Sequence, residues 1–217
     1  SAVPDSGIPA AIGYSNQSKI PYDMGIIRNH YVGRTFIEPT QQIRQLGVKL
    51  KHNANKDIIK NKKLILVDDS IVRGTTSKKI VDMLYNAGAK EIHLCISSPP
   101  IKYPDYYGID TPNVKDLIAA NHTLDEIRKI IGVDTLQFLT IEGLYKALGF
   151  EGRDNSNPQF TDHCFTGDYP VQPVDQLNQF EKNNQLSLLS NVRIWIRKMD
   201  FYYLNILLQL FDYKFLN

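Results

Sequence analysis

The chain has 217 residues, which is enough for one ordinary domain, or for one domain with an appendage. Hydrophobic residues make up 42% and charged residues 22%, a composition that excludes disorder as the main state. The 25 basic and 23 acidic residues give a net charge of +2, so the charge balance gives no reason to expect nucleic-acid binding.

Cysteine content and hydropathy indicate the cellular environment of the protein. Cys95 and Cys164 are too few for a disulfide framework or a four-thiolate metal site, which favours a reducing, cytoplasmic environment. No apolar run approaches the roughly 20 residues that span a bilayer, so we expect no contact with a membrane. The sequence opens on Ser1 with no signal-peptide pattern, and we expect it to be part of a longer protein.

The first predicted elements are a helix over residues 4–19 and a short strand over residues 22–27. Pro4, Asp5 and Ser6 are residue types that open and cap helices. Residues 28–53 are polar and show little periodicity. A long polar segment inside a compact domain is typical of a functional lid.

The middle of the chain alternates apolar strands with helices. Continuous apolar runs predict buried strands over residues 63–68, 91–97 and 135–139. Helices are predicted over residues 75–87, after a capping box at 123–126, and over residues 142–148. This order predicts an α/β fold with a mostly parallel sheet and helices on both faces.

The composition changes near Pro173. Beyond it there is no Gly or Pro, and residues 186–217 carry apolar residues on every helical face. Two interpretations stay open: a frameshifted or mispredicted end, or a genuine helix that packs on another domain or subunit. We therefore divide the chain into a domain over residues 1–173 and a C-terminal extension over residues 174–217.

The sharpest motif spans residues 66–77 (LVDDSIVRGTTS), where a predicted buried strand gives way to a helix. Ligands of open parallel sheets bind at the carboxyl ends of strands, and helix N-termini attract anions. Gly74 permits close backbone approach, and three hydroxyl residues follow it: Thr75, Thr76 and Ser77. Asp68 and Asp69 suit a sugar diol or a Mg²⁺ ion. Together these features favour a phosphate site over an ordinary helix cap.

This motif resembles the 5-phosphoribosyl-1-diphosphate (PRPP) motif of the type I phosphoribosyltransferases. Other stretches are similar to the amidophosphoribosyltransferases, the glutamine PRPP amidotransferases: residues 4–6 (PDS), 31–37 (YVGRTFI), 96–100 (ISSPP) and 107–110 (YGID). The resemblance runs over about residues 2–170. It implies a type I phosphoribosyltransferase fold that lacks its first strand and the N-terminal glutaminase domain.

The resemblance also implies an activity. The family transfers the phosphoribosyl group of PRPP to ammonia derived from glutamine, giving 5-phosphoribosylamine in the first committed step of de novo purine (IMP) biosynthesis. It implies Mg²⁺, ammonia channelled from a glutaminase domain, purine nucleotides as feedback ligands, and a homo-oligomer at full length. Two alternatives stay open: a PRPP-binding regulatory module without catalysis, and an inactive fragment of the enzyme.

Residue roles follow from the same resemblance. The implied PRPP-binding residues are Asp5, Ser6, Asp68, Asp69, Ser70, Arg73, Gly74, Thr75, Thr76 and Ser77. Asp68 and Asp69 are also the implied metal ligands. Tyr31 and Arg34 lie in the lid expected to close over PRPP, and they are the implied catalytic residues.

Some members of the family hold an iron–sulfur cluster through four cysteines. Asp105, Pro158 and Thr161 stand where three of those ligands align. Cys164 aligns with a neighbouring cysteine that is not a ligand, so we expect no iron–sulfur cluster. Cys95 is expected to act as a small buried hydrophobe. Four histidines show no metal-ligand spacing, which favours a structural role for each: His52, His93, His122 and His163.

Overall fold

The computed structural model describes residues 1–30, 52–108, 111 and 113–171. Its centre is a parallel sheet in the order β3 (Lys63–Asp68), β4 (Glu91–Ile96) and β5 (Thr135–Phe138). A separate antiparallel hairpin pairs β1 (Ile26–Arg28) with β2 (His52–Ala54). The helices are α1 (Ile8–Ser18), α3 (Lys56–Ile59), α4 (Thr75–Asn86), η2 (Val114–Asp116), α5 (Ile118–Asn121), α6 (Leu124–Ile131), α7 (Ile141–Ala147) and α8 (His163–Thr166).

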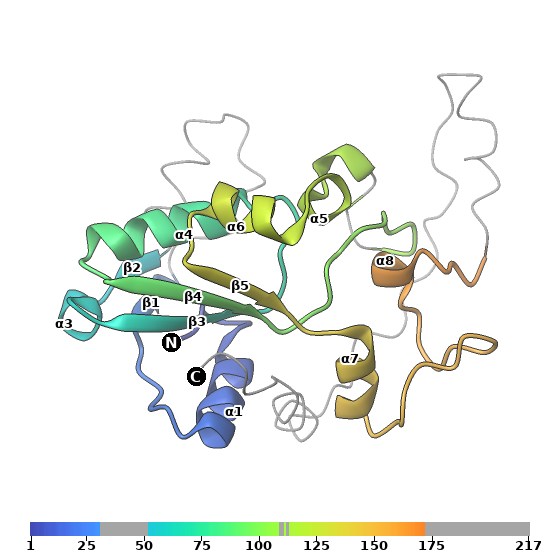
Figure 1. Ribbon diagram of the computed structural model, residues 1–217, viewed down its shortest axis with the longest axis horizontal. Helices are drawn as coiled ribbons and strands as arrows, with labels where there is room; N and C mark the ends of the chain where they lie inside the picture. Colours follow the sequence, from blue (N-terminus) through green and yellow to red (C-terminus); the bar gives the residue numbers. More distant parts are fainter. Residues whose placement is uncertain (31–51, 109–110, 112, 172–217) are drawn as a thin grey trace.

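Helices cover both faces of the parallel sheet, as the alternation of elements predicts. In Figure 1, α4 and α6 lie on one face and α1 lies on the other. Side chains alternate along β3, so Leu64 and Leu66 pack under α4 and α6 while Val67 packs against Ala10 of α1. Strand β3 therefore contributes to two hydrophobic clusters and holds the middle of the fold.

The predicted starts of two helices, α6 and α1, can be compared with the structure. The capping box before α6 is confirmed, because Thr123 and Glu126 exchange both hydrogen bonds. The predicted start of the first helix is wrong. Helix α1 begins at Ile8, and its N-cap residue Gly7 makes no side-chain cap. Residues 4–7 form a turn instead, and this turn lines the site described below.

Short elements went unrecognised in the sequence. Strand β2 has three residues and begins at the end of the segment 28–53, which we interpreted as a lid. Helices α3, α5 and α8 have four residues each, too short to produce a helical period. Their positions depend on tertiary contacts rather than on local pattern.

Residues 1–3 lie alongside β3. Ala2 forms a parallel bridge with Val67, and the backbone N–H of Val3 donates to the Val67 carbonyl at 2.8 Å. The Ser1 carbonyl accepts from the Val67 N–H at 2.9 Å. The edge of β3 therefore has a short parallel neighbour that leads directly into the turn at residues 4–7.

Among the helices of the described part of the chain, none combines the length and the apolar character needed to cross a bilayer.

Candidate functional site

A cavity of about 690 Å³ opens at the carboxyl end of β3. Ten of its lining residues are those to which the sequence analysis gave PRPP-binding roles: Asp5, Ser6, Asp68, Asp69, Ser70, Arg73, Gly74, Thr75, Thr76 and Ser77. They come from two segments that the fold brings together, the turn at residues 4–7 and the loop between β3 and α4. Tyr31 and Arg34 lie outside the described residues.

The acidic pair stands at the end of β3. Asp68 is 7% exposed, and its Oδ1 accepts a hydrogen bond from the backbone N–H of Asp69 at 2.9 Å. Burial, followed by the adjacent charge of Asp69, raises the pKa of Asp68 to about 8. A divalent cation between the two side chains would favour the ionised form of both.

The loop after the acidic pair ends in a left-handed turn at the start of α4. Gly74 has a φ of +75°, and a Cβ there would lie 2.7 Å from the Ile118 Cδ1 atom. No described side chain caps the helix at Gly74. Because the first N–H groups of a helix have no partner within it, those of α4 are available to an anion in the cavity. Arg73 lines the same cavity and forms an exposed ion pair with Asp116 at 3.2 Å.

The turn at residues 4–7 forms the opposite side of the cavity. The Gly7 N–H donates to the Val3 carbonyl at 3.0 Å, and the peptide bond between Pro4 and Asp5 is cis. A Cβ at Gly7 would lie 2.6 Å from the Val67 carbonyl oxygen and 2.8 Å from that of Val3. Both are backbone atoms, so a larger residue would push the turn away from β3. Glycine thus sets how closely the turn approaches the acidic pair.

Two further residues of the cavity were missed by the sequence analysis. Arg28 on β1 forms an ion pair with the Asp5 carboxylate. His52 on β2 is 7% exposed, and its Nε2 lies 3.4 Å from the Pro4 carbonyl oxygen. The two residues face each other across the hairpin. Their separation of 24 positions gives no local signal, since the pairing of the strands alone brings them to the turn.

The arrangement suits a ligand that carries both phosphate and cation. The start of α4 offers N–H and hydroxyl donors, the end of β3 offers two carboxylates, and the hairpin adds a guanidinium on the far side. Anionic and cationic subsites thus lie in one cavity. This combination fits a phosphorylated sugar whose diphosphate is bound through a metal ion.

The two cysteines have different surroundings. Cys95 is partly buried in β4 and packs beside Val67, and burial raises the pKa of its thiol to about 12. His163 was assigned a structural role with no metal-ligand spacing. The structure instead brings it together with Cys164 and Asp105. No local pattern predicts this cluster, because Asp105 lies 58 positions before His163.

Comparison with known proteins identifies the domain. A family model described as "Phosphoribosyl transferase domain" matches residues 2–107. The amidophosphoribosyltransferase of Rhizobium etli is 57% identical over 190 residues, covering 87% of this chain and 38% of the relative. That of Bacillus subtilis is 54% identical over 170 residues, covering 78% of this chain and 36% of the relative.

A solved structure agrees with these relatives. The B. subtilis glutamine PRPP amidotransferase complexed with ADP and GMP superimposes with a TM-score of 0.68 at 54% identity. The match covers 78% of this chain and 37% of that one. Because the R. etli match covers 87% of this chain, it reaches past residue 173 into the C-terminal extension.

The chain spans little more than a third of the length of these relatives. The part that matches the family model contains strands β3 and β4, the cavity at the end of β3 and the turn that faces it. The chain belongs to the amidophosphoribosyltransferase family, of which it carries the phosphoribosyltransferase domain.

Proposed function

We propose that this domain binds PRPP in the cavity at the end of β3 and transfers its phosphoribosyl group to ammonia, giving 5-phosphoribosylamine for purine biosynthesis. The observation that carries the proposal is that all ten residues with an implied PRPP-binding role line one cavity. These residues come from two segments, the turn at residues 4–7 and the loop between β3 and α4. The segments are distant in sequence, so the fold alone brings them together.

Each part of the ligand has a matching group. The 5′-phosphate would accept hydrogen bonds from the first turn of α4, where Thr75, Thr76 and Ser77 add hydroxyls to the free backbone N–H groups. The ribose diol would lie against Asp68 and Asp69. The diphosphate would lie on the opposite side, beneath the turn at residues 4–7.

Asp68 and Asp69 fit a Mg²⁺ ion because hard cations prefer carboxylate oxygens. When bound, the ion would neutralise charge that develops on the departing diphosphate. The residues of this chain would orient the sugar by holding its 5′-phosphate at the helix N-terminus and its diol at the end of β3. Arg28 already pairs with Asp5, so it would keep that carboxylate from repelling the diphosphate.

Ammonia is a nucleophile in its neutral form, so the transfer requires no strong general base from this domain. The ammonia would come from the glutaminase domain that the family combines with this one. Tyr31 and Arg34 are proposed to act in the closed lid, where exclusion of water protects a cationic sugar-like transition state.

The feedback ligands, the oligomeric state and the location of this protein are proposals as well. The B. subtilis structure is complexed with ADP and GMP, and we propose purine nucleotides as feedback ligands of this protein. A homo-oligomer at full length and a cytoplasmic location are proposed likewise. Among the relatives, one of 53% identity from Arabidopsis thaliana is described as chloroplastic.

The test replaces both carboxylates of the acidic pair. Asp68→Asn combined with Asp69→Asn is expected to lower Mg²⁺-dependent PRPP affinity at least a hundredfold in titration calorimetry, because two charge-assisted contacts are lost. The matched control is Asp82→Asn, which removes an exposed carboxylate of α4 outside the cavity. Unchanged PRPP affinity in a folded double variant would contradict the proposal.

The same samples separate the alternatives. The wild-type chain is expected to form 5-phosphoribosylamine when PRPP, Mg²⁺ and ammonia are supplied. Tight PRPP binding without product would favour the regulatory module. Absence of both binding and product would favour the inactive fragment.

A further inference from the structure

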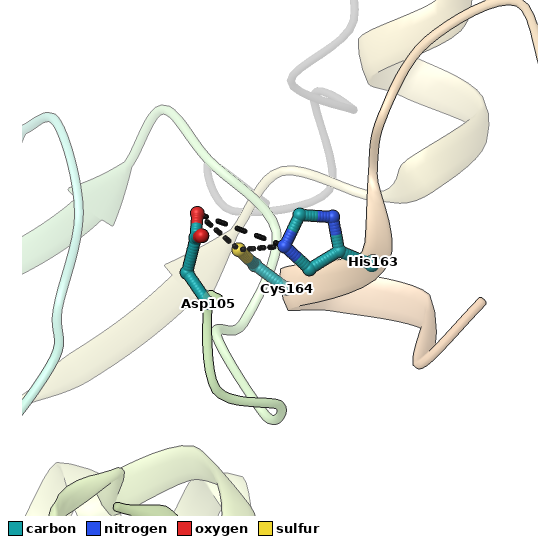
Figure 2. Close-up of side chains that lie close together, drawn as sticks. All are labelled: Asp105, His163 and Cys164. Atoms are coloured by element: carbon teal, nitrogen blue, oxygen red, sulfur yellow. Dashed lines mark hydrogen bonds and ion pairs between the residues drawn. The ribbon is translucent and has the colours of Figure 1, made fainter. Parts of the chain in front are cut away.

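Three potential metal ligands converge outside the PRPP cavity. Asp105 follows β4, while His163 and Cys164 open α8. Figure 2 shows the three side chains pointing toward one another from these two segments. The Nε2 of His163 lies 3.6 Å from the Asp105 Oδ2 and 3.5 Å from the Cys164 Sγ, and that Sγ lies 3.8 Å from the Asp105 Oδ2.

These spacings match the edges of a tetrahedral site. Zinc binds a thiolate at about 2.3 Å and an imidazole or carboxylate at about 2.0–2.2 Å, which puts tetrahedral ligand atoms about 3.4–3.6 Å apart. The three observed separations lie within about 0.2 Å of that range. A central ion would thus reach all three atoms with little movement of the side chains.

The surrounding contacts already fix two of the ligands. The backbone N–H of Tyr107 donates to Asp105 Oδ1, which leaves Oδ2 directed at the cluster. The imidazole of His163 lies between the rings of Tyr107 and Tyr169, whose centroids are 5.0 and 4.9 Å from its own. Such outer contacts hold metal ligands in position and are typical of built sites.

The backbone of Cys164 is fixed as well. Its carbonyl accepts hydrogen bonds from the N–H groups of Lys102 and Tyr103, at 2.9 and 3.0 Å. These bonds hold the start of α8 against the segment that leads to Asp105. The third ligand is therefore held by the same segment that carries the first.

His163 directs its Nε2 into the cluster from a buried position. Its side chain is 4% exposed, and within the described residues its buried Nδ1 has no hydrogen-bond partner. When Nε2 is the metal ligand, the neutral ring carries its proton on Nδ1. Neutral imidazole is the form that binds metal ions.

We propose that Asp105, His163 and Cys164 bind a single Zn²⁺ ion, with a water molecule as the fourth ligand. On binding, the Cys164 thiol loses its proton to solvent, a Zn–S bond forms, and no electron is transferred. The thiolate excludes Mg²⁺ as the natural occupant, because hard cations prefer oxygen ligands. The chain has two cysteines, so this site differs from a four-cysteine cluster.

The ion would join two segments that are distant in sequence. It would cross-link the loop after β4 to α8, beside the contact between the Tyr169 hydroxyl and the Pro104 carbonyl at 2.8 Å. The expected role is structural, since none of the three residues lines the PRPP cavity. The proposal therefore stands independently of the proposed transferase activity.

The test uses the full 217-residue chain, reduced with a phosphine and freed of metal by a chelator. Zn²⁺ titration against a chromophoric chelator is expected to show one tightly bound equivalent and to raise the melting temperature. Co²⁺ bound to the wild-type chain is expected to give the absorption of a tetrahedral ion with a thiolate-to-cobalt charge-transfer band. This band reports the Cys164 ligand without the need for any variant to fold.

Each ligand is then replaced in turn. Asp105→Asn, His163→Gln and Cys164→Ser are each expected to weaken Zn²⁺ binding at least tenfold, and Cys164→Ser to abolish the charge-transfer band. The controls Cys95→Ser and His122→Gln remove the other cysteine and an exposed histidine, and both are expected to bind like wild type. Absence of tight Zn²⁺ binding, a Co²⁺ spectrum without the sulfur band, or wild-type Zn²⁺ affinity in the three ligand variants would overturn the proposal.

Discussion

Asp68 combines a buried position with a charge that the proposed ligand would need. Its pKa is raised from 3.8 to about 8 by burial and by the charge of Asp69. Between about pH 4 and pH 8 the folded protein therefore holds a proton that the unfolded chain has lost. Because the folded state binds more protons, the free energy of unfolding falls as pH rises through this window.

We therefore predict that Asp68→Asn stabilises the ligand-free protein increasingly from pH 5 to pH 8. The gain relative to wild type is expected to grow by up to about 1.4 kcal/mol per pH unit, the free energy equivalent of one proton. Urea unfolding at several pH values measures it. The exposed-carboxylate variant Asp82→Asn serves as the control. A difference between Asp68→Asn and wild type that is independent of pH would contradict the prediction.

One side of the cavity could be predicted from the sequence, because the residues that form it are contiguous, from Asp68 to Ser77. Their spacing after an apolar strand is sufficient to predict a phosphate site. The residues that needed a distant partner were not predictable in this way. Arg28 meets Asp5 only through the hairpin, and His163 meets Asp105 only when α8 packs on the loop after β4.

At the scale of elements, the segment after α7 is tied to the core by one buried cluster. The Arg153 guanidinium donates to both carboxylate oxygens of Asp162, at 2.6 and 3.1 Å, and the Tyr145 hydroxyl of α7 donates to Oδ2 at 2.8 Å. Asp162 is the N-cap residue of α8. Although burial alone would raise the pKa of Asp162, the hydrogen bonds from Arg153, Tyr145 and Thr166 lower it overall.

We predict that Arg153→Ala lowers the free energy of unfolding by about 3–5 kcal/mol, because it leaves the Asp162 carboxylate buried without its charged partner. Arg153→Lys is expected to lose less, since it keeps the charge but not the paired N–H donors. Urea unfolding measures both variants.

The control for this prediction is Arg128→Ala. Arg128 pairs with Asp125 on the exposed surface of α6 at 2.9 Å, and removing an exposed pair costs at most about 1 kcal/mol. Similar losses for Arg128→Ala and Arg153→Ala would show that burial of the Asp162 cluster contributes little.

The sequence predicted those elements whose own residues determine them. Strand β3 and the capping box before α6 carry a continuous apolar run and a reciprocal cap, and both were confirmed. The start of α1 was misplaced because Pro4, Asp5 and Ser6 suit a helix N-terminus as well as a tight turn. Helix α8 has four residues and is held by Asp162 and by tertiary contacts, so no local period marks it.

At the scale of the whole molecule, the role of the segment 186–217 stays a prediction, since this segment lies outside the described residues. Charged residues recur in it at intervals that no single buried helix would tolerate unpaired: Arg193, Arg197, Lys198, Asp200, Asp212 and Lys214. We propose that it does not belong to the core fold.

Deleting residues 186–217 is therefore expected to leave the melting temperature unchanged, as measured by calorimetry. Truncation after residue 149 is the control. It removes Arg153 and Asp162 and is expected to lower the melting temperature sharply. A large drop for the shorter deletion would instead show a genuine C-terminal element that packs on the domain.

The attachment of both binding loops to β3 has a consequence for the length of ligand that the cavity accepts. The turn at residues 4–7 is hydrogen-bonded to the end of β3 through Val3 and Val67, and the loop between β3 and α4 continues directly from Asp68. A shift of β3 therefore carries both loops together and leaves the span between them unchanged. That span is set by backbone hydrogen bonds rather than by side-chain rotamers. Under the proposed function, we therefore expect the cavity to discriminate between ligands by the distance between their two phosphate groups.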